Sequence, residues 1–467
     1  MKLPIPKTRL IDRRENASVL IIVLWIAIGL VSIALYFANS MNYELRAADN
    51  RVNGLSAEQA IEGAARYVSY ALLNFATNGA MPDNTQFKCE AVAIGDAKFW
   101  IIGRDPNADN PTTPYFGLVD EGGKLNLNNV STNVFQYLPN MTTDFADAIM
   151  DWRGTNGVVS LDYMSLGYEP KNAPFETVDE LRLVYGATQD LLVGEDLNRN
   201  GILDANEKDL NGDGELTPGL IEDVTVYTRE PNFHADGTSL TNVNTLTSGT
   251  VSQRQFTTFM QTFFQAEGVS SSSSLTLGLF RSLSSPISQG IPTGPFTGVL
   301  DFALRCKALG MSSDDFTKLS GDVATSTNTY LRNRVNVNTA NADVLTAMFM
   351  GANVDQQTAD SAAQTLISYR QENPNNLTSI AWIIDALGNN SPVITALAKG
   401  NFVTTKSYQF TADIAAVGAF GRGYRRVKFI FDVSDGSPKI IYRQDLSRLG
   451  WALGDKVRED LVAKDTQ

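Results

Sequence analysis

The chain has 467 residues, with 38 Lys and Arg against 51 Asp and Glu, and a net charge of −13. This length suggests two or three domains, and the acidic balance disfavours nucleic acid as a partner because phosphates attract cations. His234 is the only histidine, so any histidine-dependent triad or zinc site would need this one side chain. It lies in a turn-rich stretch without a nucleophile motif, and we expect no enzyme.

The N-terminal segment predicts a membrane helix. Residues 19–38 are almost wholly apolar, and no charged side chain occurs between Asn16 and Tyr43. About 20 such residues in a helix cross a bilayer core of about 30 Å. Basic residues outnumber acidic ones before this segment, which favours a cytoplasmic N-terminus and an extracytoplasmic body. We therefore expect a single-pass, membrane-tethered protein.

The helical pattern does not stop at the end of the apolar run. Residues 44–72 keep helical residue types and spacing, whereas a secretory signal has a shorter apolar core followed by a cleavage site. One long helix, half in lipid and half outside it, is the favoured interpretation, and a plain signal anchor is the alternative. The basic leader, small residue, apolar run and amphipathic continuation resemble the class III signal of type IV pilins and pseudopilins.

Strand patterns lie towards both ends of the remaining chain, and helical patterns fill its middle. Short β-rich runs predict strands within 99–103, 115–120, 120–128, 408–414, 425–431 and 439–442. Helical spacing predicts helices at 143–152, 177–185, 256–266, 338–348, 360–370 and 379–387. The Ser-, Pro- and Gly-rich residues 270–297 are interpreted as a loop. The fold class is α+β, with a large helical domain inserted into a small antiparallel sheet.

Two of these helices carry starting signals. Thr177 and Glu180 have the spacing of a capping box, and Gly186 is placed to end that helix. Asn338 and Thr339 are predicted to cap the helix that follows them.

Cys89 and Cys306 are the only cysteines. In an oxidising compartment they are candidates for a disulfide, which depends on a Cα separation that the sequence does not give. Two unpaired, buried thiols are the alternative.

Residues 196–207 match the twelve-residue calcium loop, in which alternate residues supply hard oxygen ligands to one point. Gly201 stands at the sharp turn, and the loop lies in a strongly acidic stretch. The predicted ligands are Asp196, Asn198, Asn200, the Ile202 carbonyl, Asp204 and a bidentate Glu207. A solvated acidic turn is the alternative.

Residues 209–217 repeat the first nine positions of that loop. Leu220 stands where the bidentate Glu belongs, and Glu222 and Asp223 are candidate substitutes. The ligands of a second calcium site would be Asp209, Asn211, Asp213, Glu215 and Thr217. Flanking EF-hand helices are not evident, so we expect structural loops similar to dockerin repeats rather than a sensor.

Several stretches occur in a specific order along nearly the whole chain: Leu24 and Trp25 in the apolar segment, and residues 120–128, 148–152, 172–181 and 335–340. Together they resemble the K-type minor pseudopilins (general secretion pathway protein K) of the bacterial type II secretion system. The resemblance implies a pilin-like domain interrupted by a helical domain with two sterile-alpha-motif-like (SAM-like) hairpin units, near 131–190 and 336–390.

The resemblance also implies a domain order. The parts are a prepilin leader (1–17), a transmembrane and stalk helix (18–76), a discontinuous pilin-like α/β domain (77–130 and 401–450), the inserted helical domain (131–400, with calcium loops at 196–220) and a C-terminal tail (451–467).

Processing by prepilin peptidase is implied between Ala17 and Ser18, with methylation of the new N-terminus. Ala17 stands where most relatives have Gly. The fifth mature residue is then Ile22, where most pilins have Glu. A Glu in lipid is costly unless it is paired, so its absence suits a tip subunit with no neighbour above it.

The implied function is a non-enzymatic tip subunit that starts or caps pseudopilus assembly and supports export across the outer membrane. Its implied place is the inner membrane, with the body in the periplasm. The I- and J-type minor pseudopilins would bind its stalk helix and pilin domain. A membrane-anchored calcium-dependent binding or adhesion protein and a type IV pilus minor pilin are the alternatives. Nucleic-acid binding through the hairpins, hinted at by residues 184–186, is opposed by the acidic charge.

Overall fold

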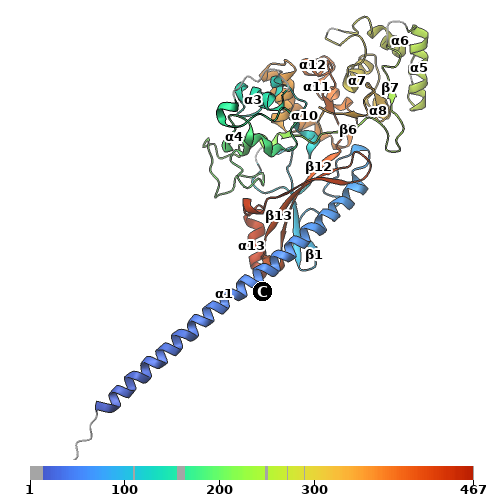
Figure 1. The fold of residues 1–467 in the computed structure, drawn as a ribbon. Helices are drawn as coiled ribbons and strands as arrows, with labels where there is room; N and C mark the ends of the chain where they lie inside the picture. The colour runs from blue at the N-terminus through green and yellow to red at the C-terminus, as the bar shows by residue number, and fades with distance from the viewer. Residues whose placement is uncertain are drawn as a thin grey trace, which may run out of the picture.

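The computed structural model describes residues 14–108, 111–154, 163–247, 251–270, 272–288 and 290–465. A long N-terminal helix, α1 (Arg14–Phe75), extends away from the rest of the chain and packs its C-terminal part on a sheet (Figure 1). A larger, mostly helical body lies at the far end of that sheet from the free part of α1.

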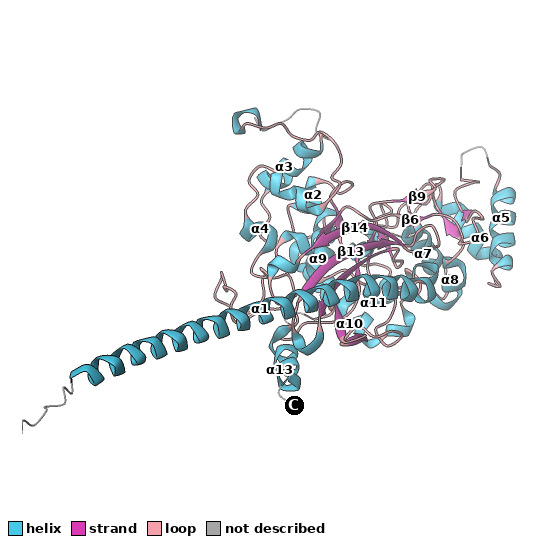
Figure 2. Cartoon of the chain, turned by 60° about the horizontal axis from the view of Figure 1, so that its bottom comes forward, coloured by secondary structure: helices cyan, strands magenta, loops and turns pink. Residues whose placement is uncertain are grey.

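The second half of α1 has a regular buried face. Its buried residues recur at intervals of three and four, as a helix packed on one side requires; they are Ala57, Ala60, Ile61, Ala64, Ala65, Val68, Ala71 and Leu72. They share one core with the sheet side chains Phe99, Phe410 and Phe429. Small residues on this face let the helix lie close to the sheet, which α1 crosses in Figure 2.

The sheet is antiparallel and draws its strands from two distant parts of the chain. Its order is β1-β2-β12-β13-β14, with β3 also paired to β12. The strands are β1 (Val92–Ile94), β2 (Ala97–Ile102), β3 (Val119–Asp120), β12 (Gln409–Val417), β13 (Arg425–Asp432) and β14 (Lys439–Asp445). The predicted combination of an apolar N-terminal helix, a small antiparallel sheet and further helices is confirmed.

Alternation along the strands divides the sheet into two faces. Phe410, Ala412, Ile414 and Ala416 of β12 belong to the core beneath α1. Ala415 and Val417 belong to a small cluster on the other face, with Trp100, Ile102, Ala452 and Leu453. The chain then ends in α13 (Gly454–Asp465).

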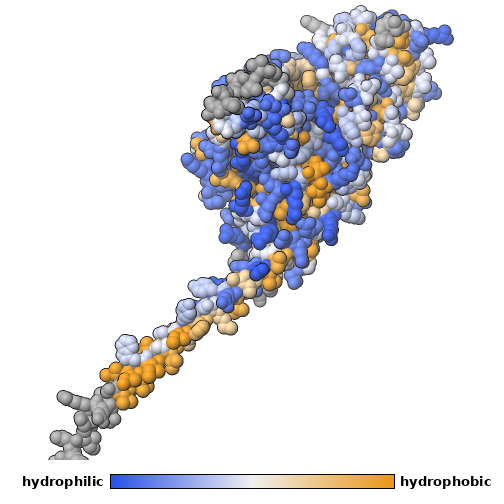
Figure 3. All heavy atoms as spheres, in the orientation of Figure 1, coloured by the Kyte–Doolittle hydropathy of each residue, from blue (hydrophilic) through white to orange (hydrophobic). Residues whose placement is uncertain are grey.

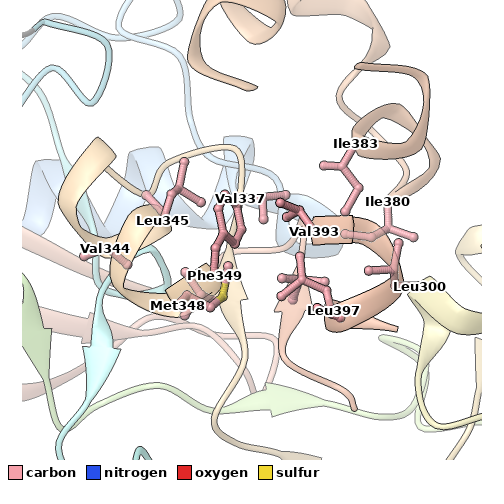
Figure 4. Close-up of a cluster of buried hydrophobic side chains, with 14 of the residues drawn as sticks. Leu300, Val337, Val344, Leu345, Met348, Phe349, Ile380, Ile383, Val393 and Leu397 are labelled. Atoms are coloured by element: carbon pink, nitrogen blue, oxygen red, sulfur yellow. The ribbon is translucent and has the colours of Figure 1, made fainter. Parts of the chain in front are cut away.

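The body between the two sets of strands has one continuous hydrophobic core, which runs from Leu125 to Val403. Figure 4 shows part of it, where Leu300, Val337, Phe349 and Ile383 converge from separate segments. The helices are α2 (Thr132–Phe135), α3 (Thr143–Arg153), α4 (Gln189–Val193), α5 (Gln253–Ala266), α6 (Ser273–Ser282), α7 (Val299–Ala308), α8 (Ser313–Ser320), α9 (Ala342–Gly351), α10 (Gln356–Glu372), α11 (Ala381–Leu387) and α12 (Pro392–Leu397).

Short two-residue strands join parts of this body. They are β4 (Leu125–Asn126), β5 (Val224–Thr225), β6 (Glu230–Pro231), β7 (Thr241–Asn242), β8 (Val323–Ala324), β9 (Tyr330–Leu331), β10 (Val335–Asn336) and β11 (Val403–Thr404). β4–β5, β7–β8 and β10–β11 pair in parallel.

These three parallel pairs belong to three copies of one local arrangement. In each copy a first asparagine closes a turn, because Asn126, Asn242 and Asn336 accept the backbone N–H two residues ahead. A second asparagine then donates its amide to a distant carbonyl: Asn128 to Phe175 at 2.9 Å, Asn244 to Phe296 at 2.8 Å and Asn338 to Leu377 at 2.9 Å. The resemblance implied SAM-like hairpin units near 131–190 and 336–390, which stay a prediction; these asparagine turns were not predicted.

Three local predictions were wrong. The Ser-rich segment contains α6, because Ser272 caps it by accepting the N–H of Leu275. The cap of α9 is Asn341, since the side chain of Asn338 is engaged by Leu377 and Trp382. The capping box of Thr177 and Glu180 is present, but it begins a 3₁₀ helix (Val178–Leu183) that stops before Gly186.

Candidate metal centre and membrane helix

Within the described residues, one helix is long and apolar enough to cross a membrane, and it is α1. Its first half has no packing partner among the residues that the structure describes: Leu20 is 71% exposed and Trp25 is 74% exposed. Figure 3 shows this end as a continuous apolar rod below a polar body. So much exposed apolar surface is unfavourable in water, which fits a segment surrounded by lipid.

The predicted processing site lies at the start of this helix. Residues 1–13 lie outside the described residues, and Ala17 and Ser18 lie in the first turns of α1 without described side chains. Ile22 is 55% exposed on the apolar rod. Among the described residues, Ile22 is therefore covered only by its own helix.

The first calcium-like loop is folded around Asp196. Its carboxylate is buried and accepts the backbone N–H of Asn200 at 2.9 Å and of Gly201 at 2.7 Å. Gly201 has φ +84°, a conformation that glycine adopts without strain. Burial raises the pKa of Asp196 to about 6, and Arg104 opposes the rise.

Glu207 closes the other side of this loop. Its two carboxylate oxygens accept the N–H of Asn198 at 3.0 Å and of Asp204 at 3.1 Å. Glu207, which was predicted to be a bidentate ligand, thus accepts hydrogen bonds from the third and ninth residues of the loop. Burial raises the pKa of Glu207.

The two loop asparagines face Asp204 through their nitrogen atoms. Asn198 donates at 2.5 Å and Asn200 at 2.9 Å to the same oxygen of Asp204. The Oδ1 atom of Asn198 is buried without a hydrogen-bond partner among the described residues. An unsatisfied buried carbonyl oxygen costs free energy, and a cation beside it would remove that cost.

The loop is also fixed to the sheet. Arg426 of β13 is fully buried, pairs with Asp413 through two hydrogen bonds, and donates to the carbonyls of Asn198 and Arg199. Arg104 donates to the Arg199 carbonyl at 3.1 Å. Two guanidinium groups from the sheet region therefore hold the backbone of the loop.

The oxygen atoms of this loop are of the kinds that calcium binds. Within the described parts of the chain, no three Asp, Glu, His or Cys side chains are grouped as metal ligands, so an ion depends on amide and carbonyl oxygens as well. The residues that would hold it are Asp196, Asn198, Asn200, Ile202, Asp204 and Glu207.

The second loop is more exposed. Asp209 accepts the N–H of Gly212 at 2.5 Å and of Gly214 at 2.9 Å, and these hydrogen bonds lower its pKa. Asn211 donates to Asp213 at 2.8 Å and to Thr217 at 3.0 Å. The backbone N–H of Glu215 is bonded to Asp213.

Neither proposed substitute for the missing glutamate reaches this loop. Glu222 is engaged by Arg104 at 3.0 Å; although burial alone raises its pKa, Arg104 and Lys124 lower it to about 2. Asp223 accepts the side-chain amide of Asn341 at 2.7 Å. Glu222 ends a 3₁₀ turn (Leu220–Glu222) and Asp223 caps it, and sequence spacing did not reveal their partners, Arg104 and Asn341.

The two cysteines do not form a disulfide in the structure. Both are free and buried, Cys89 in the core beneath α1 and Cys306 in the core of the body. Burial raises the pKa of both thiols, that of Cys89 to about 12. His234 lies 3.1 Å from Asp322 and is one-third exposed.

No protein-family model matches the chain, and no curated protein matches it at a significant level. The function proposed for it therefore rests on its own residues and geometry.

Proposed function

We propose that this chain is a non-enzymatic minor pseudopilin, anchored in the inner membrane with its body in the periplasm, at the tip of a type II secretion pseudopilus. It would start or cap assembly with other minor pseudopilins and so support protein export.

One observation carries the proposal. A single helix of 62 residues is exposed and apolar at its start and becomes the packed spine of an antiparallel sheet at its end, without interruption. A plain membrane anchor needs only the apolar first half of this helix. A continuous helix makes the membrane segment and the sheet one rigid unit, as a subunit that is lifted out of the membrane during assembly requires.

Two further features favour the tip. The inserted body lies beyond the sheet, at the end away from the apolar part of α1 (Figure 1), where a subunit stacked above would collide with it. Ile22 leaves the membrane segment without a buried carboxylate to meet the N-terminus of a neighbouring subunit.

Calcium has a structural role in this proposal. The first loop lies against β13 through Arg426 and against the C-terminal segment through Trp451, whose carbonyl accepts from Asn198 at 3.1 Å. An ion there would stiffen the contact between the body and the sheet. Calcium is available outside the cytoplasm, so moderate affinity would suffice.

Site-specific photocrosslinking in intact cells tests the proposed assembly. A crosslinker at Leu45, which is 65% exposed on α1, should capture small pilin-like proteins that carry their own apolar N-terminal helix. Leu183, 54% exposed on the body, is the matched control, and a crosslinker there should capture none of these proteins. If stalk positions capture no such protein, the anchored calcium-dependent binding protein becomes the better account.

A further inference from the structure

The body carries an open groove of about 720 Å³ beside α3 and α4, which lie on the same side of the molecule (Figure 1). Three separate segments line the groove: residues 140–147 at the start of α3, residues 185–195 around α4, and residues 210–217. Ligand pockets in proteins have volumes of about 300–1,000 Å³. The groove is therefore large enough to hold several side chains of a partner.

Hydrogen bonds and close backbone packing hold the walls of this groove in place. Thr142 accepts the N–H of Phe145 at 3.2 Å, which fixes the start of α3. The N–H of Glu195 donates to the carbonyl of Thr217 at 3.1 Å. A Cβ on Gly194 would lie 2.4 Å from that carbonyl oxygen, so only glycine permits this approach. A site whose walls are already ordered loses little conformational entropy on binding.

The charge of the groove has one sign. Asp144, Asp147, Asp190 and Glu195 line it, and no Lys, Arg or His is among its lining residues in the described chain. Glu195 accepts two backbone N–H groups, whereas the three aspartates form no ion pair among the described residues. A concave surface of one sign focuses the electrostatic field and attracts the opposite charge. The complementary ligand is therefore cationic.

Apolar side chains lie beside these carboxylates. Tyr185 is 45% exposed and Leu210 is 46% exposed, and both line the groove together with Phe145 and Leu191. An aromatic face binds a guanidinium group, and the aliphatic stem of Lys or Arg packs on apolar surface. A bare metal ion would leave these side chains uncovered. The complementary ligand therefore carries apolar groups as well as positive charge.

We propose that this groove docks an extended peptide segment of a partner protein in which Lys or Arg side chains alternate with apolar ones. Asp144, Asp147 and Asp190 pair with its cations, and Tyr185 and Leu210 contact its apolar side chains. The inference goes beyond the tip role and requires neither that role nor a bound calcium ion.

A peptide-binding measurement tests the proposal. The probe is a labelled pentapeptide of alternating arginine and leucine, titrated with the full chain in nonionic detergent at fixed free calcium and followed by fluorescence anisotropy. Wild type should bind it saturably and should not bind the same peptide with glutamate in place of arginine. Asp144→Asn combined with Asp190→Asn should weaken binding about tenfold.

The matched control removes two charges elsewhere. Asp314 and Asp360 are exposed residues of α8 and α10 that do not line the groove. Asp314→Asn combined with Asp360→Asn should leave the affinity unchanged. Tyr185→Ala should weaken binding about two- to fivefold, and Tyr185→Phe should keep it. Equal melting temperatures would show that the variants fold.

A photocrosslink to wild type needs no variant. A pentapeptide with a photoreactive leucine should label residues 140–147 or 185–195, as mapped by mass spectrometry. Labelling confined to other segments would overturn the proposal. Equal affinity for the arginine and glutamate peptides, equal losses in the groove and control variants, or no saturable binding would overturn it as well.

Discussion

The two calcium-like loops share a sequence pattern but have different surroundings. The first is held by Arg426 and Arg104, and its residues Asp196, Asn198 and Asn200 are buried. The second is exposed at Asn211, Asp213 and Glu215 and is bonded to Glu195, which adjoins the first. A loop motif therefore specifies the local backbone, whereas residues distant in the sequence decide how strongly it is coupled to the fold.

The largest expected effect comes from the sheet residue that holds the first loop. Arg426→Met would leave Asp413 buried without its partner and remove the hydrogen bonds to the carbonyls of Asn198 and Arg199, of which Arg199 keeps its bond from Arg104. We expect unfolding free energy to fall by about 3–5 kcal/mol, measured by denaturant titration.

Arg443→Met is the matched control, because Arg443 forms an exposed ion pair with Glu62. Exposed pairs contribute about 0–1 kcal/mol. Equal, small losses in both variants would show that the first loop is not anchored by Arg426.

Calcium removal should have the next largest effect. At free calcium about 100-fold above the dissociation constant, one site stabilises the fold by about 2.7 kcal/mol. EGTA should lower the melting temperature of wild type and leave Asp196→Ala less affected. Melting curves of wild type that coincide with and without EGTA would rule out a structural ion.

The Asp223→Asn variant tests whether Asp223 is a buried residue of the body or a calcium ligand of the second loop. Burial, with the repulsion of Asp343 and Glu222, raises the pKa of Asp223 from 3.8 to about 7. The folded state therefore holds a proton that the unfolded state releases, and stability is lost as pH rises from about 4 to 7. The variant keeps an acceptor for Asn341 and should be more stable at pH 8, on the order of 1–3 kcal/mol.

The same variant should match wild type near pH 4 and should bind calcium normally. Thermal melts at the two pH values and a calcium titration check this. Weaker calcium binding in Asp223→Asn would instead show that Asp223 is a ligand of the second loop.

Local patterns predicted the long helix and the β12 and β13 strands, because these depend on spacing within one segment. Patterns could not find the contact of Glu195 with the second loop, which depends on a backbone reversal that places residue 195 beside 217. The asparagine units could not be predicted either, because each depends on a hydrogen bond to a carbonyl 39 to 52 residues away.

The N-terminus of the membrane-extracted protein, determined by mass spectrometry, tests the central claim most directly. The account predicts a chain that begins at N-methylated Ser18, because prepilin peptidase would cut after Ala17. An intact Met1, or a cut beyond the apolar run, would contradict the pseudopilin assignment and leave a membrane-anchored, calcium-dependent binding protein.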